Sequence, residues 1–189
     1  MIQNSQHGFR KRRSCLTNLF EFLDKVSGYV DSSGNVDIAF LDFAKAFDKV
    51  SHRKLLLKLQ AHEIESKLLD WITQWLKNSV QRVCIKGIES DWLLVLSGVP
   101  QGSVLGPILF LIFINDLNFG IKSWILKFAD DTKIFNRIKS TADATTLHED
   151  LYTLISWAEE WQMMFNVDKC KVMHIGTSDL CRQHYMHGH

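Results

Sequence analysis

The sequence lacks the paired cysteines that mark disulfide-rich and zinc-ribbon proteins. Its cysteines stand far apart and form no CxxC pair: Cys15, Cys84, Cys170 and Cys181. This spacing excludes a disulfide framework and is typical of reduced thiols in an intracellular protein of the cytoplasm or nucleus. Residues 181–189 hold a cysteine and histidines, but no second cluster of ligands supports a zinc site there.

Long apolar runs are also missing. The longest covers residues 108–114 and ends at Asn115 and Asp116, far short of the ~20 residues that a membrane-spanning helix needs. No apolar stretch follows the charges near the N-terminus, so a signal peptide is not expected. The chain has 189 residues, of which 46% are hydrophobic and 23% are charged. This composition predicts one folded domain and no membrane association.

A strong net charge is absent as well. The formal net charge is +1, so a nucleic-acid binder would need its basic residues gathered locally. They are densest at Arg10, Lys11, Arg12 and Arg13. One interpretation is a patch that contacts phosphates, and the other is a solvated helix start or a localisation signal.

Hydrophobic periodicity and turn residues predict an α+β fold without internal repeats. A helix should begin after Ser14 as N-cap and bury one face, formed by Leu16, Leu19, Phe20, Leu23 and Val26. Further helices are expected at 54–61, 66–77, 104–117 and after Ser140, and strands or hairpins at 36–42, 80–96, 124–135 and 171–175. This mixture predicts an antiparallel sheet with helices on one face.

Three acidic residues stand at the ends of apolar strands. Asp42 ends strand 36–42, and Asp130 and Asp131 lie at the turn of hairpin 124–135. Adjacent carboxylates in an apolar hairpin would leave a buried charge unpaired, unless the backbone turns there or a metal ion binds them. Magnesium prefers such oxygen ligands, and two ions about 4 Å apart can activate an attacking hydroxyl and stabilise a leaving phosphate oxygen. An ordinary hairpin turn is the alternative for the pair, and Asp48 is a second candidate ligand beside Asp42.

A loop with glycines precedes the predicted helix 104–117. It reads GVPQGSVLGP, from Gly98 to Pro107. Backbone N–H groups at a helix N-terminus favour an anionic phosphate, and the amide of Gln101 can bind a base or sugar edge. Loops of this kind are common before helices, so this one is informative only together with the acidic residues.

Three strings in fixed order resemble the palm motifs of reverse transcriptases of non-LTR retrotransposons: LDFAKAFD, GVPQGSVLGP and KFADDT. Their residues are similar in kind to those of jockey-like elements. QHGFRKRRSC and WAEEWQMMFNVDKCKVMHIG resemble the segments before and after the palm in these elements. The resemblance spans Gln6 to Gly176. It implies a partial fingers segment at 1–35, a polymerase palm at 36–176 and a C-terminal tail at 177–189, with no thumb.

The resemblance also implies roles for the acidic and aromatic residues. Asp42 and Asp130 would bind two Mg²⁺ ions, or Mn²⁺ in their place, and Asp131 would be the less direct third acid. Phe47 stands where the family has the aromatic ring that excludes a ribose 2′-hydroxyl and so selects deoxynucleotides. Its alternative is an ordinary core phenylalanine.

Further roles follow for residues that would contact the substrates. Gln101 and Gly102 match positions near the incoming nucleotide and the template strand. Lys169 matches the lysine that protonates the pyrophosphate leaving group, since an ammonium suits developing negative charge. Arg82, like the basic run at residues 10–13, would contact nucleic acid.

Two positions depart from the family pattern. Ser79 and Val80 stand where such elements usually carry basic residues before the arginine at position 82, which weakens a claim of tight template binding there. Glu63 replaces a glycine that is common before Ile64, at a turn that needs a positive φ.

The resemblance implies an RNA-directed DNA polymerase, a nucleotidyltransferase that adds dNTPs to a DNA primer on an RNA template. One alternative is a truncated, catalytically inactive retroelement remnant that only folds or binds nucleic acid. The intact acids favour the polymerase, whereas the missing fingers motifs favour the remnant. Another alternative is a magnesium-dependent phosphohydrolase, which would release phosphate without primer or template.

Overall fold

A computed structural model describes residues 1–32 and 34–176 of the chain, and the cysteine and histidines at 181–189 lie outside this part. Its helices are α1 (Cys15–Asp31), α2 (His52–Ala61), α3 (Ser66–Lys77), α4 (Leu105–Phe113), the 3-10 turn η1 (Asn115–Asn118) and α5 (Thr141–Trp161). Its strands are β1 (Asn35–Leu41), β2 (Val80–Gln81), β3 (Cys84–Ile85), β4 (Ile88–Glu89), β5 (Leu93–Leu94), β6 (Trp124–Phe128), β7 (Asp131–Ile138) and β8 (Lys171–Ile175). No described helix is long and apolar enough to cross a membrane.

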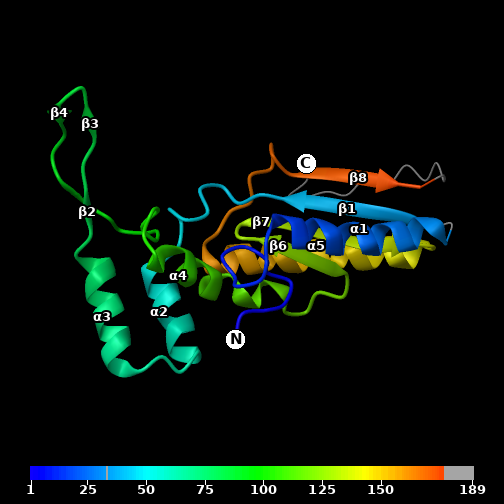
Figure 1. Cartoon of the computed structure of the whole chain (residues 1–189), viewed down its shortest axis with the longest axis horizontal. Coiled ribbons are helices and arrows are strands. Elements are labelled where there is room, and N and C mark those ends of the chain that lie inside the picture. Colours follow the sequence, from blue (N-terminus) through cyan, green and yellow to red (C-terminus); the bar gives the residue numbers. More distant parts are fainter. Residues whose placement is uncertain (33, 177–189) are drawn as a thin grey trace. The chain divides into compact units, whose positions relative to one another are not determined.

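The chain forms two compact units, whose helices and strands are labelled in Figure 1. The first unit combines residues 1–44 with the described residues from Ile114 onward, and the second unit is Lys45–Phe113. The predicted α+β class is confirmed. The assignment of residues 1–35 to fingers and 36–176 to palm stays a prediction.

The first unit contains a four-stranded antiparallel sheet in the order β6-β7-β1-β8. The predicted strands at 36–42 and 171–175 are confirmed, with β1 ending one residue earlier, at Leu41. Strand β7 is longer than the predicted 132–135, because it continues to Ile138 in register with Asn35 of β1. The sheet therefore brings segments from both ends of the chain side by side.

Helix α1 packs on one face of this sheet. Ser14 is its N-cap as predicted, because its hydroxyl accepts a hydrogen bond from the Thr17 N–H. Phe22 and Val26 form a core with strand residues such as Ile38 and Phe135. The predicted buried face is largely wrong, since four of its members are exposed: Leu16, Leu19, Phe20 and Leu23. The helix carries apolar residues on more than one side, and the sheet selects the side with Phe22 and Val26.

Helix α5 covers the opposite face. Ile134 and Ile138 of β7 alternate with Phe135 along the strand and are completely shielded from solvent or nearly so. The helix that contacts β7 is α5, and its buried residues include Leu147, Leu151, Leu154, Ile155 and Ala158. The sheet is therefore backed by helices on both faces instead of one.

The N-terminus of α5 carries a pH-sensitive cap. The Asp143 carboxylate accepts hydrogen bonds from the N–H groups of Lys139 and Ser140, at 2.9 Å each. The hydrogen bond from the Lys139 N–H is the main reason why the pKa of Asp143 lies below its usual value.

We expect the capping interaction of Asp143 to be lost in acid. Because the folded state lowers this pKa, the stabilisation is present above pH ~4 and disappears as the pH falls through the lowered value. Asp143→Asn keeps an acceptor oxygen but cannot titrate. The difference in free energy of unfolding between the two proteins, measured with urea, should be at most about 1 kcal/mol at pH 6 and should shrink toward pH 3. A difference that does not change with pH would contradict this account.

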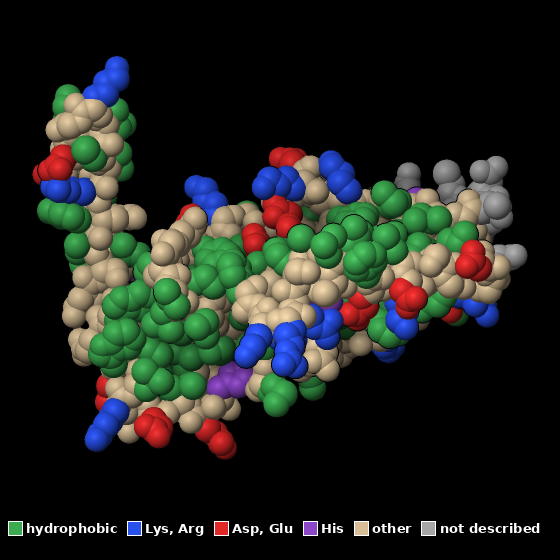
Figure 2. All heavy atoms as spheres, in the orientation of Figure 1, with side chains coloured by type: hydrophobic (Ala, Val, Ile, Leu, Met, Phe, Trp, Pro, Cys, Tyr) green, Lys and Arg blue, Asp and Glu red, His purple; other side chains and the backbone are tan. Residues whose placement is uncertain are grey.

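The second unit contains α2, α3 and α4 together with a hairpin. Helix α3 spans the predicted range, and Ile72 and Leu76 are its buried residues. Helix α4 ends at Phe113, earlier than the predicted 117, because the asparagine and aspartate residues that follow favour the 3-10 turn η1 over helix. Figure 2 shows hydrophobic side chains gathered over the helices of this unit on the face in view. Several apolar residues of α2 and α3 are exposed, namely Leu57, Leu68 and Trp71.

The hairpin predicted at 80–96 is confirmed but is built from very short strands. Strand β2 pairs with β5, and β3 pairs with β4 around a two-residue turn, Lys86 and Gly87. Both turn residues have positive φ, 51° and 82°, as a type I′ hairpin turn requires. Figure 1 shows the hairpin extending beyond the end of α3.

The turn after α2 has a left-handed backbone at position 63, where the family resemblance predicts a turn with positive φ that usually holds a glycine. Glu63 has φ 56°. The N–H of Ile64 donates to the Leu59 carbonyl, and the N–H of Glu63 donates to the Gln60 carbonyl. This pattern is a Schellman motif, in which the position of Glu63 favours glycine. The helix thus ends as expected, with a residue that bears the conformational strain of a left-handed backbone.

Candidate active site

Asp42 follows β1 and is held in place by the segment after α5. The N–H of Asn166 donates to the Asp42 carbonyl, and the N–H of Ala44 donates to the Met164 carbonyl, at 2.8 Å each. The Phe43 ring stacks on Phe165 with centroids 4.4 Å apart. The segment 162–170 therefore crosses the end of β1 and carries Lys169 to the same place.

Asp130 and Asp131 occupy the turn between β6 and β7, as predicted. The turn consists of Ala129 and Asp130, and Asp131 is the first residue of β7, paired with Phe128. Ala129 has a positive φ of 55°, a conformation that is unfavourable for a residue with a Cβ atom.

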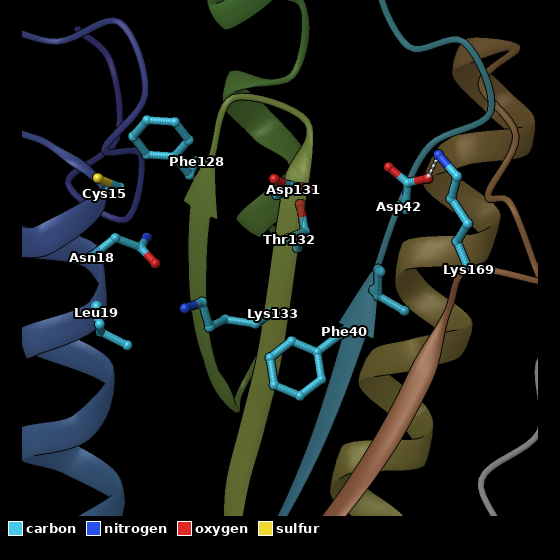
Figure 3. Close-up of a pocket in the computed structure, with 11 residues that line it drawn as sticks. Cys15, Asn18, Leu19, Phe40, Asp42, Phe128, Asp131, Thr132, Lys133 and Lys169 are labelled. Carbon is cyan, nitrogen blue, oxygen red and sulfur yellow. Dashed lines mark ion pairs between the residues drawn. The ribbon is translucent and has the colours of Figure 1, made fainter.

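The register of β1 and β7 brings the acidic residues to one end of the sheet. Leu41 is paired with Thr132, so the next residues outward along the two strands are Asp42 and Asp131. Because neighbouring strands point paired residues to the same face, both carboxylates belong to the face that α1 covers. Figure 3 shows them at the same end of adjacent strands.

Lys169 forms an ion pair with Asp42. Its Nζ lies 2.9 Å from Oδ2 of Asp42 (Figure 3). The hydrogen bond to this carboxylate raises the pKa of Lys169, and the charges of Asp42, Asp130 and Asp131 act in the same direction. The lysine is thus the cationic partner of the acidic group, although its side chain is 67% exposed.

The environment of Asp130 disfavours the charged form of its carboxyl group. Burial is the main cause that raises its pKa, and the carboxylates of Asp131 and Asp42 raise it further, while Lys169 lowers it. The charge of Asp130 is therefore influenced by groups that are distant from it in the sequence, Asp42 and Lys169. A carboxylate in this situation gains from a nearby cation.

A cavity of about 460 Å³ lies beside the carboxylates. It is bounded by α1 and the sheet, and its lining includes Leu19, Phe40, Phe128, Asp42, Asp131 and Lys133. Figure 3 shows the carboxylates at one end, with Phe40 and Lys133 further along the strands. The cavity combines an apolar surface with charges of both signs, which suits a ligand that has a flat apolar part and an ionic part.

The chemistry of the donors fits a hard divalent cation, because all three are carboxylates. Within residues 1–32 and 34–176, however, no group of three or more His, Cys, Asp or Glu side chains is gathered closely enough to hold a metal ion. The Lys169 ammonium instead provides positive charge at Asp42.

The predicted substrate-binding residues meet within the second unit. The Phe47 ring stacks on Phe110 with centroids 4.3 Å apart, and the Phe47 carbonyl accepts a hydrogen bond from the Val99 N–H. Gln101 donates from Nε2 to Asp48 at 2.9 Å. Asp48 is therefore a partner of Gln101 within the second unit.

Gly102 lies in the same loop and has φ 81° with open space around its Cα. A cavity of about 720 Å³ adjoins this loop. Its lining includes Lys45, Lys49, Gln81 and Gln101. Basic and amide side chains of this kind can bind a phosphate backbone and base edges.

The predicted nucleic-acid contacts are partly engaged within the protein. Arg10 donates to the backbone carbonyls of Gln3 and Gln6, and Arg13 lies 3.2 Å from Glu21. Lys11 and Arg12 are exposed. Their roles in binding nucleic acid stay predictions.

Arg82 is held within the hairpin. It pairs with Glu89 and lies over the Trp92 ring, with Cζ 4.4 Å from the ring centroid. A phosphate would have to compete with Glu89 for this guanidinium. Its assignment as a nucleic-acid contact also stays a prediction.

Sequence reasoning missed one residue at the acidic cluster. The side chain of Gln6 contacts the Ala129 backbone, immediately before Asp130. No local pattern identifies this residue, and the only signal was the similarity of the string QHGFRKRRSC to the segment that precedes the palm.

Comparisons with known proteins agree with the sequence motifs. Residues 1–186 match the family model described as reverse transcriptase (RNA-dependent DNA polymerase). The RNA-directed DNA polymerase from the mobile element jockey of Drosophila melanogaster is 31% identical over 178 residues. The probable RNA-directed DNA polymerase from transposon X-element of the same species is 30% identical over 171 residues.

The chain spans only part of these relatives. The alignments cover 89% and 87% of this chain but 19% of each relative. Among solved structures, apo telomerase from Candida tropicalis without its C-terminal domain matches with a TM-score of 0.68 at 12% identity, over 93% of this chain and 37% of that one. This likeness shows a shared fold.

Proposed function

Because this chain belongs to the reverse transcriptase (RNA-dependent DNA polymerase) family, we propose that it serves as the catalytic core of an RNA-directed DNA polymerase of a non-LTR retrotransposon. The reaction is the transfer of a nucleotide from a dNTP to the 3′-hydroxyl of a DNA primer on an RNA template. Relatives at about 30% identity named as such polymerases support this proposal.

The observation that carries the proposal is the meeting of Asp42, Asp130 and Asp131 at one end of the sheet. They come from segments far apart in sequence, and the β1–β7 register, with Asp42 and Asp131 following the Leu41–Thr132 pair and Asp130 next in the turn, supports this view. A protein gains no stability from three neighbouring carboxylates. Such an arrangement is expected where a site binds cations.

We assign Asp42 and Asp130 as the ligands of two Mg²⁺ ions, for which Mn²⁺ can substitute, and Asp131 as the third acid. When bound, these ions would activate the primer hydroxyl and stabilise the charge of the leaving pyrophosphate. The excess of negative charge around Asp130 supports this assignment.

Lys169 is the proton donor in this proposal. An ammonium beside the acidic cluster suits the negative charge that develops on pyrophosphate. In the structure it pairs with Asp42, so it competes with a cation for that carboxylate.

Replacing Lys169 with Met is expected to separate these two effects. Loss of the ammonium should strengthen Mn²⁺ binding only by about fivefold or less, because water and salt screen an exposed ion pair. The same change should slow primer extension, since the proton donor is lost. Titration calorimetry with Mn²⁺ and the rate of single-nucleotide addition measure the two effects. If neither the affinity for Mn²⁺ nor the rate of nucleotide addition changes, Lys169 has no role in the site.

Phe47, Gln101 and Gly102 are proposed to contact the incoming nucleotide and the template. Their meeting in the second unit supports this role, because the Phe47 backbone and the loop of Gln101 are joined by hydrogen bonds. Exposed Lys11 and Arg12 would add contacts to the nucleic acid backbone. The proposed partners are thus an RNA template, a DNA primer and dNTPs, in the cytoplasm or nucleus.

RNA-templated primer extension tests the proposal. The chain is incubated with a DNA primer annealed to RNA, dNTPs and Mg²⁺, and the products are separated by length. Extension should require template, dNTPs and Mg²⁺, and should stop with EDTA. An inactive remnant would bind the duplex without extending the primer. A phosphohydrolase would release phosphate from dNTPs when primer and template are omitted.

A further inference from the structure

The N-terminal segment lies along the outer edge of the sheet, at β6. The N–H of His7 donates to the Lys127 carbonyl, and the N–H of Lys127 donates to the Ser5 carbonyl, at 2.8 Å each. These bonds form a parallel bridge between Gln6 and Lys127. The segment therefore reaches the turn that carries Asp130 from the side.

Gln6 uses its whole amide group on that turn. Its Oε1 accepts hydrogen bonds from the N–H groups of Ala129 and Gly8, at 2.8 Å each. Its Nε2 donates to the Ala129 carbonyl at 3.1 Å. Gln6 is 2% exposed, so these bonds are shielded from water. One side chain thus satisfies both backbone groups of Ala129.

Gly8 allows this close approach. A Cβ atom at position 8 would lie 2.4 Å from the Ala129 nitrogen. Any other residue would push the segment away from the turn, because that distance is far below van der Waals contact. The backbone of the segment and the turn are therefore packed directly against each other.

His7 anchors the same segment on α1. It is completely buried, and its Nδ1 lies 2.8 Å from the Thr17 hydroxyl. Its Nε2 lies 3.2 Å from a carboxylate oxygen of Glu21. Gln6 is thus held from both sides, by β6 and by α1, and has a fixed position from which to act on the turn.

The turn needs such support for two physical reasons. Ala129 adopts a left-handed backbone, which is unfavourable for a residue with a Cβ atom. In addition, Asp130 is close enough to Asp131 and Asp42 for their charges to affect it. Without a restraint, the turn can relax to relieve strain and to separate the carboxylates.

We propose that Gln6 is a positioning residue that clamps the Ala129 backbone and so holds Asp130 in the conformation that binds the catalytic cations. This inference rests on the proposed polymerase function but concerns a residue that touches no substrate. It explains why the amide bonds both backbone groups of the one turn residue that precedes Asp130.

Two substitutions at Gln6 and one control test the clamp. Gln6→Met has a similar shape and removes all three hydrogen bonds. Gln6→Glu keeps the acceptor for the Ala129 N–H, loses the donor to the Ala129 carbonyl and adds a charge near Asp130. Asn115→Ala is the matched control, because Asn115 binds Gln3 and Met1 of the same segment through two hydrogen bonds that do not involve the turn residues.

Three quantities are measured for each protein. Amide hydrogen exchange of Ala129 should accelerate at least tenfold in Gln6→Met and remain slow in Asn115→Ala. The Kd for Mn²⁺ should rise about tenfold or more in Gln6→Met and by less than twofold in the control, while in Gln6→Glu the added negative charge should offset part of this rise. In primer extension, kcat should fall in the Gln6 variants while KM for dNTP stays nearly constant, because the nucleotide contacts are intact.

The outcomes are distinguishable. Faster exchange at Ala129 without weaker Mn²⁺ binding or a lower kcat would show a structural contact only and would overturn the proposal. Equal effects of Gln6→Met and Asn115→Ala would overturn it as well. If the unmodified chain neither binds Mn²⁺ nor extends a primer, the polymerase function fails and the positioning role falls with it. Hydrogen exchange would still report whether Gln6 restrains the turn.

Discussion

Replacing Asp130 with Asn should lower the rate of RNA-templated primer extension by about a thousandfold or more. The carboxylate is a proposed ligand of both cations, and an amide oxygen binds Mg²⁺ much more weakly than a carboxylate does. A thousandfold loss corresponds to about 4 kcal/mol of transition-state stabilisation, which is of the size expected when metal-ion catalysis is impaired. Single-turnover extension at saturating dNTP measures the chemical step directly.

The same substitution should stabilise the fold when no metal is present. Burial and neighbouring carboxylates raise the pKa of Asp130, so the folded state disfavours its charged form. Relative to Asp130→Asn, the unmodified protein therefore loses stability as the pH rises through the raised pKa. In EDTA at pH 7, the variant should need more urea to unfold, and Mg²⁺ should stabilise the unmodified protein more than the variant.

Asp70→Asn is the matched control for both measurements, because Asp70 is an exposed residue of α3. It should leave the extension rate and the effect of Mg²⁺ on stability unchanged. An Asp130→Asn protein that extends primers normally would show that this carboxylate does not bind the catalytic ions. A variant that is less stable than the unmodified protein in EDTA would show that Asp130 is structurally favourable, against the electrostatics described above.

Replacing Phe47 with Ala should let ribonucleotides into the product. If the ring lies against C2′ of the incoming sugar, it penalises an added hydroxyl by steric overlap, and its removal should lower discrimination between dNTP and rNTP by about 10- to 200-fold. The ratio of kcat/KM for dCTP and CTP on an RNA template measures the discrimination. Extension with dCTP should change much less.

The stacking of Phe47 on Phe110 supplies a second variant. Phe110→Leu keeps most of the buried volume but removes an aromatic contact worth about 1 kcal/mol. It should loosen the Phe47 ring and reduce sugar discrimination partly. If Phe47→Ala destabilises the protein but leaves the dNTP preference intact, Phe47 is only a packing residue.

Local patterns predicted much of the secondary structure. Helix α3 and strand β8 have the predicted bounds, and Ser14 and Ser140 cap helices as expected. These features depend on contacts between residues close in sequence, such as the capping hydrogen bond from the Thr17 N–H to Ser14. The positive φ of Glu63 was expected from the family resemblance, because a glycine is common at this position.

Errors arose where distant contacts decide between local alternatives. In α1 the sheet buries Phe22 and leaves Leu19 and Phe20 exposed, although all three are apolar. Which side of such a helix is buried depends on the angle at which it meets β1 and β6. Likewise, Asp48 binds Gln101, which lies more than fifty residues later and comes close only in the folded second unit.

The sequence by itself determined the family and the candidate acidic residues. The motifs around Asp42 and Asp130 are short strings in a fixed order, so they can be identified without knowledge of the fold. Tertiary structure alone decided that Asp42 and Asp131 lie at the same end of adjacent strands, through the pairing of Leu41 with Thr132. It also decided that Lys169 reaches Asp42 and that Gln6 reaches the Ala129 backbone. The physical reason is that strand register and segment crossing are set by long-range hydrogen bonds and packing, which no local pattern encodes.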